Sequence, residues 1–444
     1  MTGQIPPTTP SLPSAAASSP RELLSLVLPG IGVGVLSALG LLVLSVVAAK
    51  LQDVLWTWLP EQIGVSGTSP LWIFGMLTAV GLVAGLVVTF VPGHAGPDPA
   101  TTDLAAPPLP PRVLPGLAIA VLLTLAGGVS LGPENPIIAL NMGLAVALGL
   151  RLAPALPVPA WAGLAVAGTL GAMFGTPVAA ALALSETTSS SPRPLWDRLF
   201  GPLVAAAAGS ITMTLLAGES FVLAVDPYLQ PVLVDLASGA LIAAGAAAIG
   251  MVAIYAFPIV HDAFQRLGSP LLALVVGGAV LGVLGAIGGP LTLFKGLDEM
   301  KELTADAGSY AAPQLAAFAL IKLAAVLVAG TAGFRGGRIF PSVFVAVALG
   351  LAFHAAFPAI PEAVALGASL VGILVAVTRS GWLSIFMAVL MVGQPAFLPL
   401  ACILVLPAWL VVTGRPTMLI PSEDAITVKD RVTTPVDPGP ARSS

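Results

Sequence analysis

Long apolar stretches without ionisable side chains constrain this chain more than any other feature. Asp, Glu, Lys and Arg are all absent from residues 23–49, 62–97, 113–133, 152–185 and 380–414. Because about 20 apolar residues cross the hydrocarbon core of a bilayer as a helix, several of these stretches are long enough to span it. Charged residues make up only 9% of the chain, against about 25% in soluble domains. The sequence therefore predicts an all-α, polytopic membrane protein whose solvent is the lipid bilayer.

The remaining composition narrows the classes of partner and chemistry. A net charge of −4 and the lack of a basic cluster argue against a nucleic-acid partner. The single cysteine, Cys402, excludes an intrachain disulfide. The histidines His94, His261 and His354 have no metal-ligand spacing, so no metal or other cofactor is expected. The sequence offers no nucleophile, carboxylate pair or metal cluster, so the chain is not expected to be an enzyme.

Polar ends and short apolar segments indicate how the chain is organised. Residues 1–20, rich in Ser, Thr, Pro and Ala, and the polar residues 421–444 are predicted to be tails that flank a membrane domain over 21–420. Several apolar segments in that domain are too short to cross a bilayer alone, and the chain contains 48 Gly and 42 Pro. Non-helical backbone at membrane depth is tolerated only where protein or a water-filled cavity satisfies it. Broken and re-entrant helices around a binding site near the midplane are therefore predicted.

Two matching motifs indicate an internal repeat. The stretches 132–136 and 337–341 both read G-x-x-x-P, and their glycines lie 205 positions apart. The hexapeptide AVALGL at 145–150 recurs 201 positions later, although its information content is low. Together these matches favour two homologous halves, about 21–220 and 230–420. They leave open whether the halves are inverted.

Glu134 is the residue that most suggests a functional site. It is the only charged residue between Arg112 and Arg151, and it opens an apolar segment. A carboxylate inside a membrane is costly and commonly functional, although helix ends also carry carboxylates as caps. An anion at membrane depth needs backbone N–H groups from several converging helix N-termini. The two G-x-x-x-P openings and the segment 93–99 are the candidates for such N-termini.

These motifs resemble those of the CLC family of chloride channels and chloride–proton antiporters. The segment 113–136 keeps Gly132, Glu134 and Pro136 of the family's G-R-E-G-P motif. Met173–Pro177, followed by Glu186, resembles the family's F-N-A-P run before a carboxylate. Gly336–Pro341 resembles its G-G-x-F-x-P motif. Thr413–Pro416 resembles the turn before its last cytoplasmic helix. The resemblance covers roughly residues 23–420.

The resemblance implies two inverted halves in a homodimer of the cell membrane, each multi-pass subunit with its own pathway for chloride or a similar anion. Glu134 would be the gating glutamate, whose carboxylate occupies an anion site until it is protonated or displaced. The family's inner-gate tyrosine falls on Met418, which would also contact the anion. The other anion-binding positions that the resemblance implies are Gly93, His94, Ala95, Gly96, Gly132, Gly337, Arg338 and Ile339.

Departures from the family's motifs bear on the mode of transport. Pro133 replaces the arginine before the gating glutamate. Thr187 stands where proton-coupled members have a second carboxylate, and Met418 has no hydroxyl. These changes favour passive or weakly proton-coupled anion transport. One alternative is a chloride–proton antiporter with Glu186 as its inner proton relay. Another is a secondary transporter outside the family that uses Glu134 as its protonation site.

The other charged residues have simpler interpretations. Arg338 either replaces the positive charge lost at Pro133 and raises anion occupancy, or extends to the lipid headgroups. Arg335 is predicted to be an ordinary interfacial charge, and Lys322 to reach the surface or pair with an acid. The charged stretch 298–306 is predicted to be a solvated loop.

Overall fold

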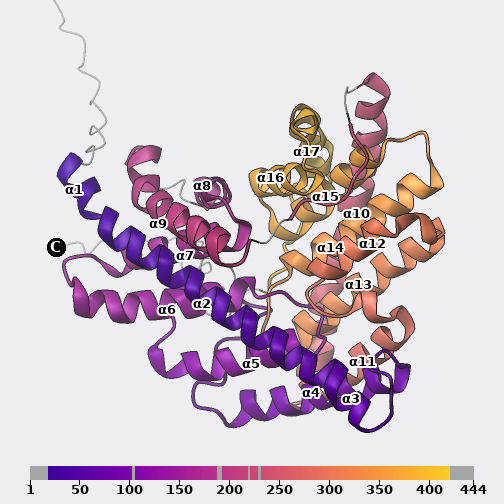
Figure 1. Cartoon of the computed structure of the whole chain (residues 1–444), viewed down its shortest axis with the longest axis horizontal. Coiled ribbons are helices and arrows are strands. Elements are labelled where there is room, and N and C mark those ends of the chain that lie inside the picture. The colour runs from indigo at the N-terminus through magenta and orange to yellow at the C-terminus, as the bar shows by residue number, and fades with distance from the viewer. Residues whose placement is uncertain (1–18, 103–105, 188–192, 219–220, 229–231, 421–444) are drawn as a thin grey trace, which may run out of the picture. The chain divides into compact units, whose positions relative to one another are not determined.

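The computed structural model describes residues 19–102, 106–187, 193–218, 221–228 and 232–420 (Figure 1). Over these residues, helices are the only extended regular elements, and they are joined by turns and one isolated antiparallel β-bridge. Nine of the described helices are long and apolar enough to cross a membrane, and shorter apolar helices lie between them. The predicted all-α membrane fold with broken helices is confirmed. The predicted tails lie almost entirely outside the described residues.

The helices follow one another closely along the chain, and proline in the first turn, where its missing N–H costs nothing, begins several of them. In order they are α1 (Pro20–Ser25), α2 (Val27–Asp53), α3 (Leu59–Gln62), α4 (Pro70–Phe90), α5 (Leu114–Ala126), α6 (Glu134–Leu152), α7 (Val158–Phe174), α8 (Pro177–Thr187), α9 (Leu195–Leu216), α10 (Leu233–Gln265), α11 (Pro270–Gly288), α12 (Leu297–Ala305), α13 (Ala312–Ala332), α14 (Ile339–Ala356), α15 (Glu362–Thr378), α16 (Gly381–Val392) and α17 (Leu398–Val412).

The helix order repeats with the spacing found in the sequence. Helices α6, α7 and α8 begin about 205 residues before α14, α15 and α16, and each pair is of nearly equal length. Gly128 and Gly333, 205 positions apart, both adopt a left-handed backbone conformation. Gly132 and Gly337, the first residues of the two G-x-x-x-P motifs, form the antiparallel bridge. An antiparallel pairing of equivalent positions is the local geometry of a two-fold axis that relates the two motifs.

The chain forms two compact units. The first contains the chain up to Val43 together with Asn141–Ser220. Its helices α7 and α9 pack so closely that a Cβ atom on Gly171 would lie 2.2 Å from the carbonyl oxygen of Ala206. Asn141 donates hydrogen bonds to the carbonyl of Ser37 and to the hydroxyl of Thr169 at 3.1 and 3.0 Å, which ties three helices together inside this unit.

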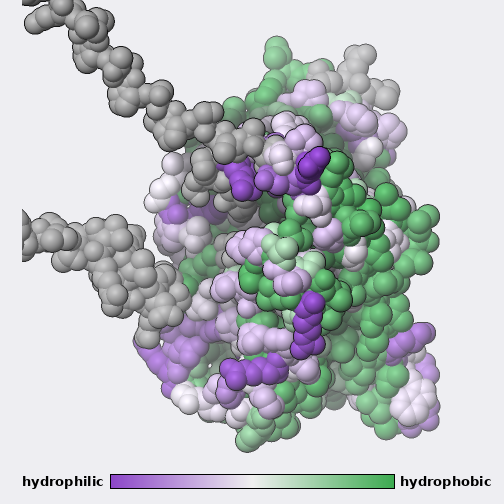
Figure 2. Space-filling model, turned by 90° about the vertical axis from the view of Figure 1, so that its left-hand side faces the viewer, coloured by the Kyte–Doolittle hydropathy of each residue, from purple (hydrophilic) through white to green (hydrophobic). Residues whose placement is uncertain are grey.

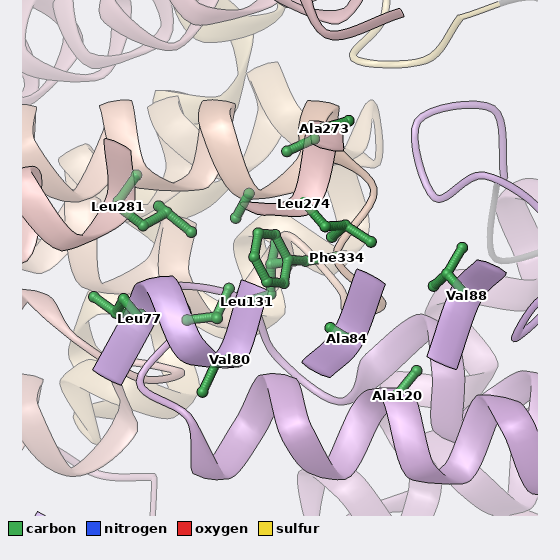
Figure 3. Close-up of a cluster of buried hydrophobic side chains, with 14 of the residues drawn as sticks. Leu77, Val80, Ala84, Val88, Ala120, Leu131, Ala273, Leu274, Leu281 and Phe334 are labelled. Atoms are coloured by element: carbon green, nitrogen blue, oxygen red, sulfur yellow. The ribbon is translucent and has the colours of Figure 1, made fainter. Parts of the chain in front are cut away.

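The second unit contains Leu44–Leu140 and the chain from Phe221 onward. Helix α4 packs along α11, and Figure 3 shows apolar side chains of both helices, including Leu77 and Leu274, gathered around Phe334. Helix α14 packs against α13 and α15, and every residue from Ile339 to Ala352 is buried. A helix that is apolar on all faces and buried throughout is typical of the inside of a large membrane protein.

Broad parts of the exposed surface are apolar (Figure 2). Figure 2 shows broad areas of hydrophobic residues, and long aliphatic side chains such as Leu241, Val252 and Ile259 of α10 are exposed. Such a surface is suited to contact with lipid chains. The stretch 298–306, predicted to be a solvated loop, instead lies mostly in α12, whose Leu297, Met300 and Leu303 are buried. The prediction was wrong because these apolar residues are spaced to give one buried helical face among the charges.

Candidate functional site

Glu134 lies at the N-terminus of α6, and its side chain is only 1% exposed. Its Oε1 atom accepts a hydrogen bond of 2.6 Å from the backbone N–H of Phe340, in the first turn of α14. Its Oε2 atom is buried and receives no hydrogen bond from the described residues. Phe340 in turn stacks on Phe221, with ring centroids 5.9 Å apart. The carboxyl group is therefore enclosed and only half satisfied.

The bridge between Gly132 and Gly337 creates the space that the carboxyl group occupies. The two residues exchange backbone hydrogen bonds of 2.8 and 2.6 Å, which bring the starts of α6 and α14 together. A Cβ atom on Gly337 would lie 1.9 Å from Oε2 of Glu134, and one on Gly132 would lie 2.3 Å from the same atom. Real Cβ atoms do not come so close to an oxygen. Glycine is needed at both positions because the carboxyl group rests directly against the backbone.

Burial disfavours a charged carboxyl group at this place, and the surrounding dipoles and charges offset part of that cost. Two helix N-termini meet there, and each carries unpaired N–H groups and the positive end of a helix dipole. The N–H groups of Glu134 and Ile339 also act on the carboxylate, as does the positive charge of Arg338. If the Glu134 side chain moves away or becomes neutral, these donors become available to another small anion.

A small cavity of about 120 Å³ adjoins this place. It is lined by Asn135, Arg338, Ile339 and Met418, among others. Since a water molecule takes up about 30 Å³ in the liquid, the cavity has room for a few waters or a small hydrated anion. Arg338 donates a hydrogen bond to the carbonyl of Met418, and its guanidinium carbon lies 5.1 Å from the centre of the Phe257 ring. Three of the predicted anion-binding residues therefore share one cavity.

Arg379 lines the same cavity, and the sequence analysis did not single it out. It lies between α15 and α16 with a φ of 55° and donates to the carbonyls of Val412 and Pro416. These bonds hold the segment that carries Met418. A signal was present in the sequence, because Arg379 directly precedes the charge-free stretch 380–414. Its partners, 33 or more residues away, could not be read from spacing.

The predicted segment Gly93–Gly96 forms a tight turn after α4. Its residues all have positive φ values, at 83°, 51°, 53° and 82°. The N–H groups of His94 and Gly96 donate to the carbonyls of Val91 and Gly93, so these two N–H groups are already used. The carbonyls of the turn face Arg335. A cavity of about 570 Å³ is lined by Ala95 together with Asn135 at the start of α6.

The prediction that Arg335 is an ordinary interfacial charge was wrong. Its side chain is buried, with 7% of its surface exposed, and it donates to the carbonyls of His94, Ala95, Gly96 and Gly333. Carbonyl groups about 240 positions away in the sequence satisfy it. Of the two alternatives for Lys322, it does not reach the surface: it is fully buried and donates to three consecutive carbonyls, those of residues 292–294. The acid whose charge acts on it is Glu299.

Glu186, the candidate proton relay, lies near the end of α8 in the first unit and is exposed. It belongs to a different unit from Glu134. The structure thus brings together Glu134, Gly132 and Gly337, and groups Arg338, Ile339 and Met418 around the adjoining cavity. It places Gly93–Gly96 beside Arg335.

Known proteins resemble this chain in sequence and in fold. The family model described as "Voltage gated chloride channel" matches residues 80–413. The "Putative ion-transport protein YfeO" of Escherichia coli (strain 55989 / EAEC) is 51% identical over 401 residues, which cover 90% of this chain and 96% of that protein.

Two solved structures share the fold at low sequence identity. The crystal structure of a CLC-type fluoride/proton antiporter superposes with a TM-score of 0.73 at 18% identity, covering 90% of this chain and 98% of that one. That of a slow cyanobacterial Cl⁻/H⁺ antiporter gives 0.74 at 17% identity, covering 94% and 98%. With the family model matching most of its length, the chain belongs to the voltage gated chloride channel family, the CLC family.

Proposed function

We propose that this protein moves a small inorganic anion, chloride in the simplest case, across the cell membrane by a route that passes Glu134. The observation that carries the proposal is the half-satisfied Glu134 carboxyl group at the meeting point of two helix N-termini. A carboxylate in that position is a chemical stand-in for a bound anion. Because the chain belongs to the CLC family, the alternative of a secondary transporter outside that family is not needed.

The energetics of the position support a gate. A hydrogen bond to a charged group contributes about 1.5–3 kcal/mol, and a helix N-terminus about 0.3–2 kcal/mol. The carboxylate takes up both contributions while it occupies the site. A mobile anion gains them only when the Glu134 side chain is protonated or displaced. Glu134 and the anion therefore compete for the same donors, and this competition controls the flow.

The residues around the route favour passive or weakly proton-coupled transport. Met418, at the position of the family's inner-gate tyrosine, is buried and has no hydroxyl to offer to an anion. Arg338 adds a positive charge beside the cavity, where Pro133 has removed one from the motif of Glu134. A homodimer, with one pathway in each subunit, is part of this proposal.

Proton-coupled antiport is the second candidate. Two solved structures with the same fold are those of a fluoride/proton antiporter and a Cl⁻/H⁺ antiporter. In that mode Glu134 would carry protons as well as gate the anion, and Glu186 would take the inner relay position. The exposure of Glu186 on α8 gives it access to solvent protons.

The experiment is anion efflux from chloride-loaded liposomes that contain the purified protein, with external chloride and pH recorded together. Efflux with no proton movement supports passive transport, whereas efflux that drives protons uphill supports the antiporter. Glu134→Gln removes the charge without changing the size of the side chain, so efflux should lose its pH dependence and any proton movement should stop. Glu61→Gln, at an exposed position in α3, is the matched control and should behave as wild type.

The outcomes separate the candidates further. If Glu186→Gln abolishes proton movement while anion efflux survives, the antiporter is supported. If wild-type protein releases no chloride, fluoride and nitrate are tested next. Efflux that keeps its full pH dependence in Glu134→Gln would contradict the assignment of the gate.

A further inference from the structure

Arg335 is a buried cation that the proposed gating step does not use. Its Nε donates to the carbonyl of Ala95 at 2.9 Å, and its Nη2 donates to those of His94 and Gly96 at the same distance. Its Nη1 donates to the carbonyl of Gly333 at 2.9 Å. Four of the five N–H groups of the planar guanidinium are thus engaged by neutral backbone carbonyls.

The turn held by Arg335 is strained on its own. Left-handed backbone is unfavourable for residues with a Cβ atom, yet His94 and Ala95 both adopt it. Strained backbone persists only where its surroundings determine it. Here the guanidinium donates hydrogen bonds to three successive carbonyls. These bonds stabilise a backbone conformation that is unfavourable for the residues of the turn themselves.

The charge of Arg335 is not neutralised by an ion pair. Among the described residues no carboxylate lies within 4.0 Å of its guanidinium. The acid whose charge acts on it is Asp98, and that carboxylate is held by His261 at 3.0 Å and by the N–H of Ala100 at 2.9 Å. In a low-dielectric interior, an unpaired positive charge attracts anions over a longer distance than it does in water.

The position of Arg335 connects the turn with the proposed route. It lies two residues before Gly337, in the segment that leads into α14. It lines a cavity of about 510 Å³ together with His94, and it also lines the cavity of about 570 Å³ that Asn135 shares. Asn135 in turn lines the small cavity of Arg338. Arg335 thus lines two of the three cavities, and Asn135 lines one of those two together with the small cavity of Arg338.

A turn in the second half, at residues 292–294, is held by a clamp that corresponds to Arg335 in position but differs from it chemically. Ser130, 205 positions before Arg335, donates through its hydroxyl to the carbonyl of Thr292 at 3.0 Å. The cation that donates to the carbonyls of the turn at 292–294 is Lys322. None of the described residues 292–294 lines the three cavities named above. The equivalent position therefore secures a turn without placing a charge beside the route.

We propose that Arg335 is a positioning and specificity-determining residue of the anion pathway. It fixes the shape of the Gly93–Gly96 turn and supplies a positive charge to the wall of the route. This inference rests on the proposed function. It predicts that Arg335 sets the anion affinity and the preference among anions, whereas Ser130 affects stability alone.

The test compares Arg335→Lys, Arg335→Met and the matched control Ser130→Ala with wild type in the liposome efflux assay. The chloride concentration that gives half-maximal flux is measured, together with the ratio of chloride to nitrate flux and the unfolding temperature in detergent. Lysine keeps the charge but lacks the planar fork, so it cannot hold three carbonyls in the same geometry. We expect Arg335→Met to raise the half-maximal concentration about tenfold, the change that corresponds to losing one charge-assisted contact. Arg335→Lys should keep much of the affinity but lose the chloride-to-nitrate preference.

The outcomes distinguish this inference from the proposed function. If wild type transports chloride and both Arg335 variants lower only the unfolding temperature, the inference fails and the proposed function stands. The same conclusion follows if Ser130→Ala shifts the half-maximal concentration as much as Arg335→Met. If wild type transports none of the tested anions, the proposed function fails and this inference with it. If Arg335→Met does not fold, Arg335→Lys decides through the chloride-to-nitrate ratio.

Discussion

A single added methyl group at Gly337 tests the geometry of the proposed gate directly. In Gly337→Ala, the new Cβ atom would lie 1.9 Å from Oε2 of Glu134, so the carboxyl group has to leave its place. Gly337 is not among the residues with positive φ, so alanine brings no backbone strain of its own. The main effect of the substitution is therefore to disfavour the state in which Glu134 occupies the site.

The size of the effect follows from the bond that is lost. Moving the carboxylate breaks its hydrogen bond of 2.6 Å with the N–H of Phe340, a contact with a charged group that contributes about 1.5–3 kcal/mol. Since about 1.4 kcal/mol corresponds to a factor of ten, the ratio of closed to open gate should fall about 10- to 150-fold. The measured flux should rise by up to that factor and stop at the rate of Glu134→Gln.

The assay is chloride efflux from liposomes between pH 4.5 and 8, with each variant first shown to be folded by its thermal unfolding in detergent. Gly245→Ala is the matched control, because a Cβ atom at this position in α10 meets nothing within 4 Å. The double variant Glu134→Gln, Gly337→Ala should be no faster than Glu134→Gln alone, because both changes act on one group. Wild-type flux and pH dependence in a folded Gly337→Ala protein would refute the placement of the carboxylate.

Two further predictions concern stability. Burial alone would raise the pKa of Asp98, but hydrogen bonds from His261 and the N–H of Ala100 outweigh it and hold the pKa below its ordinary value. The stabilisation from this carboxylate is therefore complete above about pH 4 and is lost as the pH falls through the folded-state pKa. The variant Asp98→Asn lacks this carboxylate, so its unfolding temperature should depend less on pH below about pH 4 than that of wild type. Lys322→Met should destabilise the protein by about 3–5 kcal/mol, because three carbonyls lose the Lys322 ammonium, only that of Thr292 keeps Ser130 as a donor, and the Glu299 carboxylate loses its neighbouring charge. An unchanged urea midpoint for Lys322→Met would contradict the role of that cation.

The sequence by itself determined the class of fold and the central residue of the site. Stretches without charged side chains gave the membrane helices, because hydrocarbon accepts only apolar side chains and internally bonded backbone. The spacing of two G-x-x-x-P motifs gave the repeat, since glycine and proline restrict the backbone locally. Glu134 was recognisable because a lone carboxylate in such surroundings is costly.

The tertiary structure decided which groups meet. The pairing of Gly132 with Gly337 brought the two motifs together and placed the Glu134 carboxyl group against the first turn of α14, where Phe340, 206 residues away, donates to it. The prediction for Arg335 was wrong because three of its carbonyl partners belong to the Gly93–Gly96 turn, about 240 positions earlier in the sequence. Periodicity and composition report the local backbone and the solvent around it. The partners of a buried charge depend instead on contacts between distant segments, and these exist only once the chain has folded.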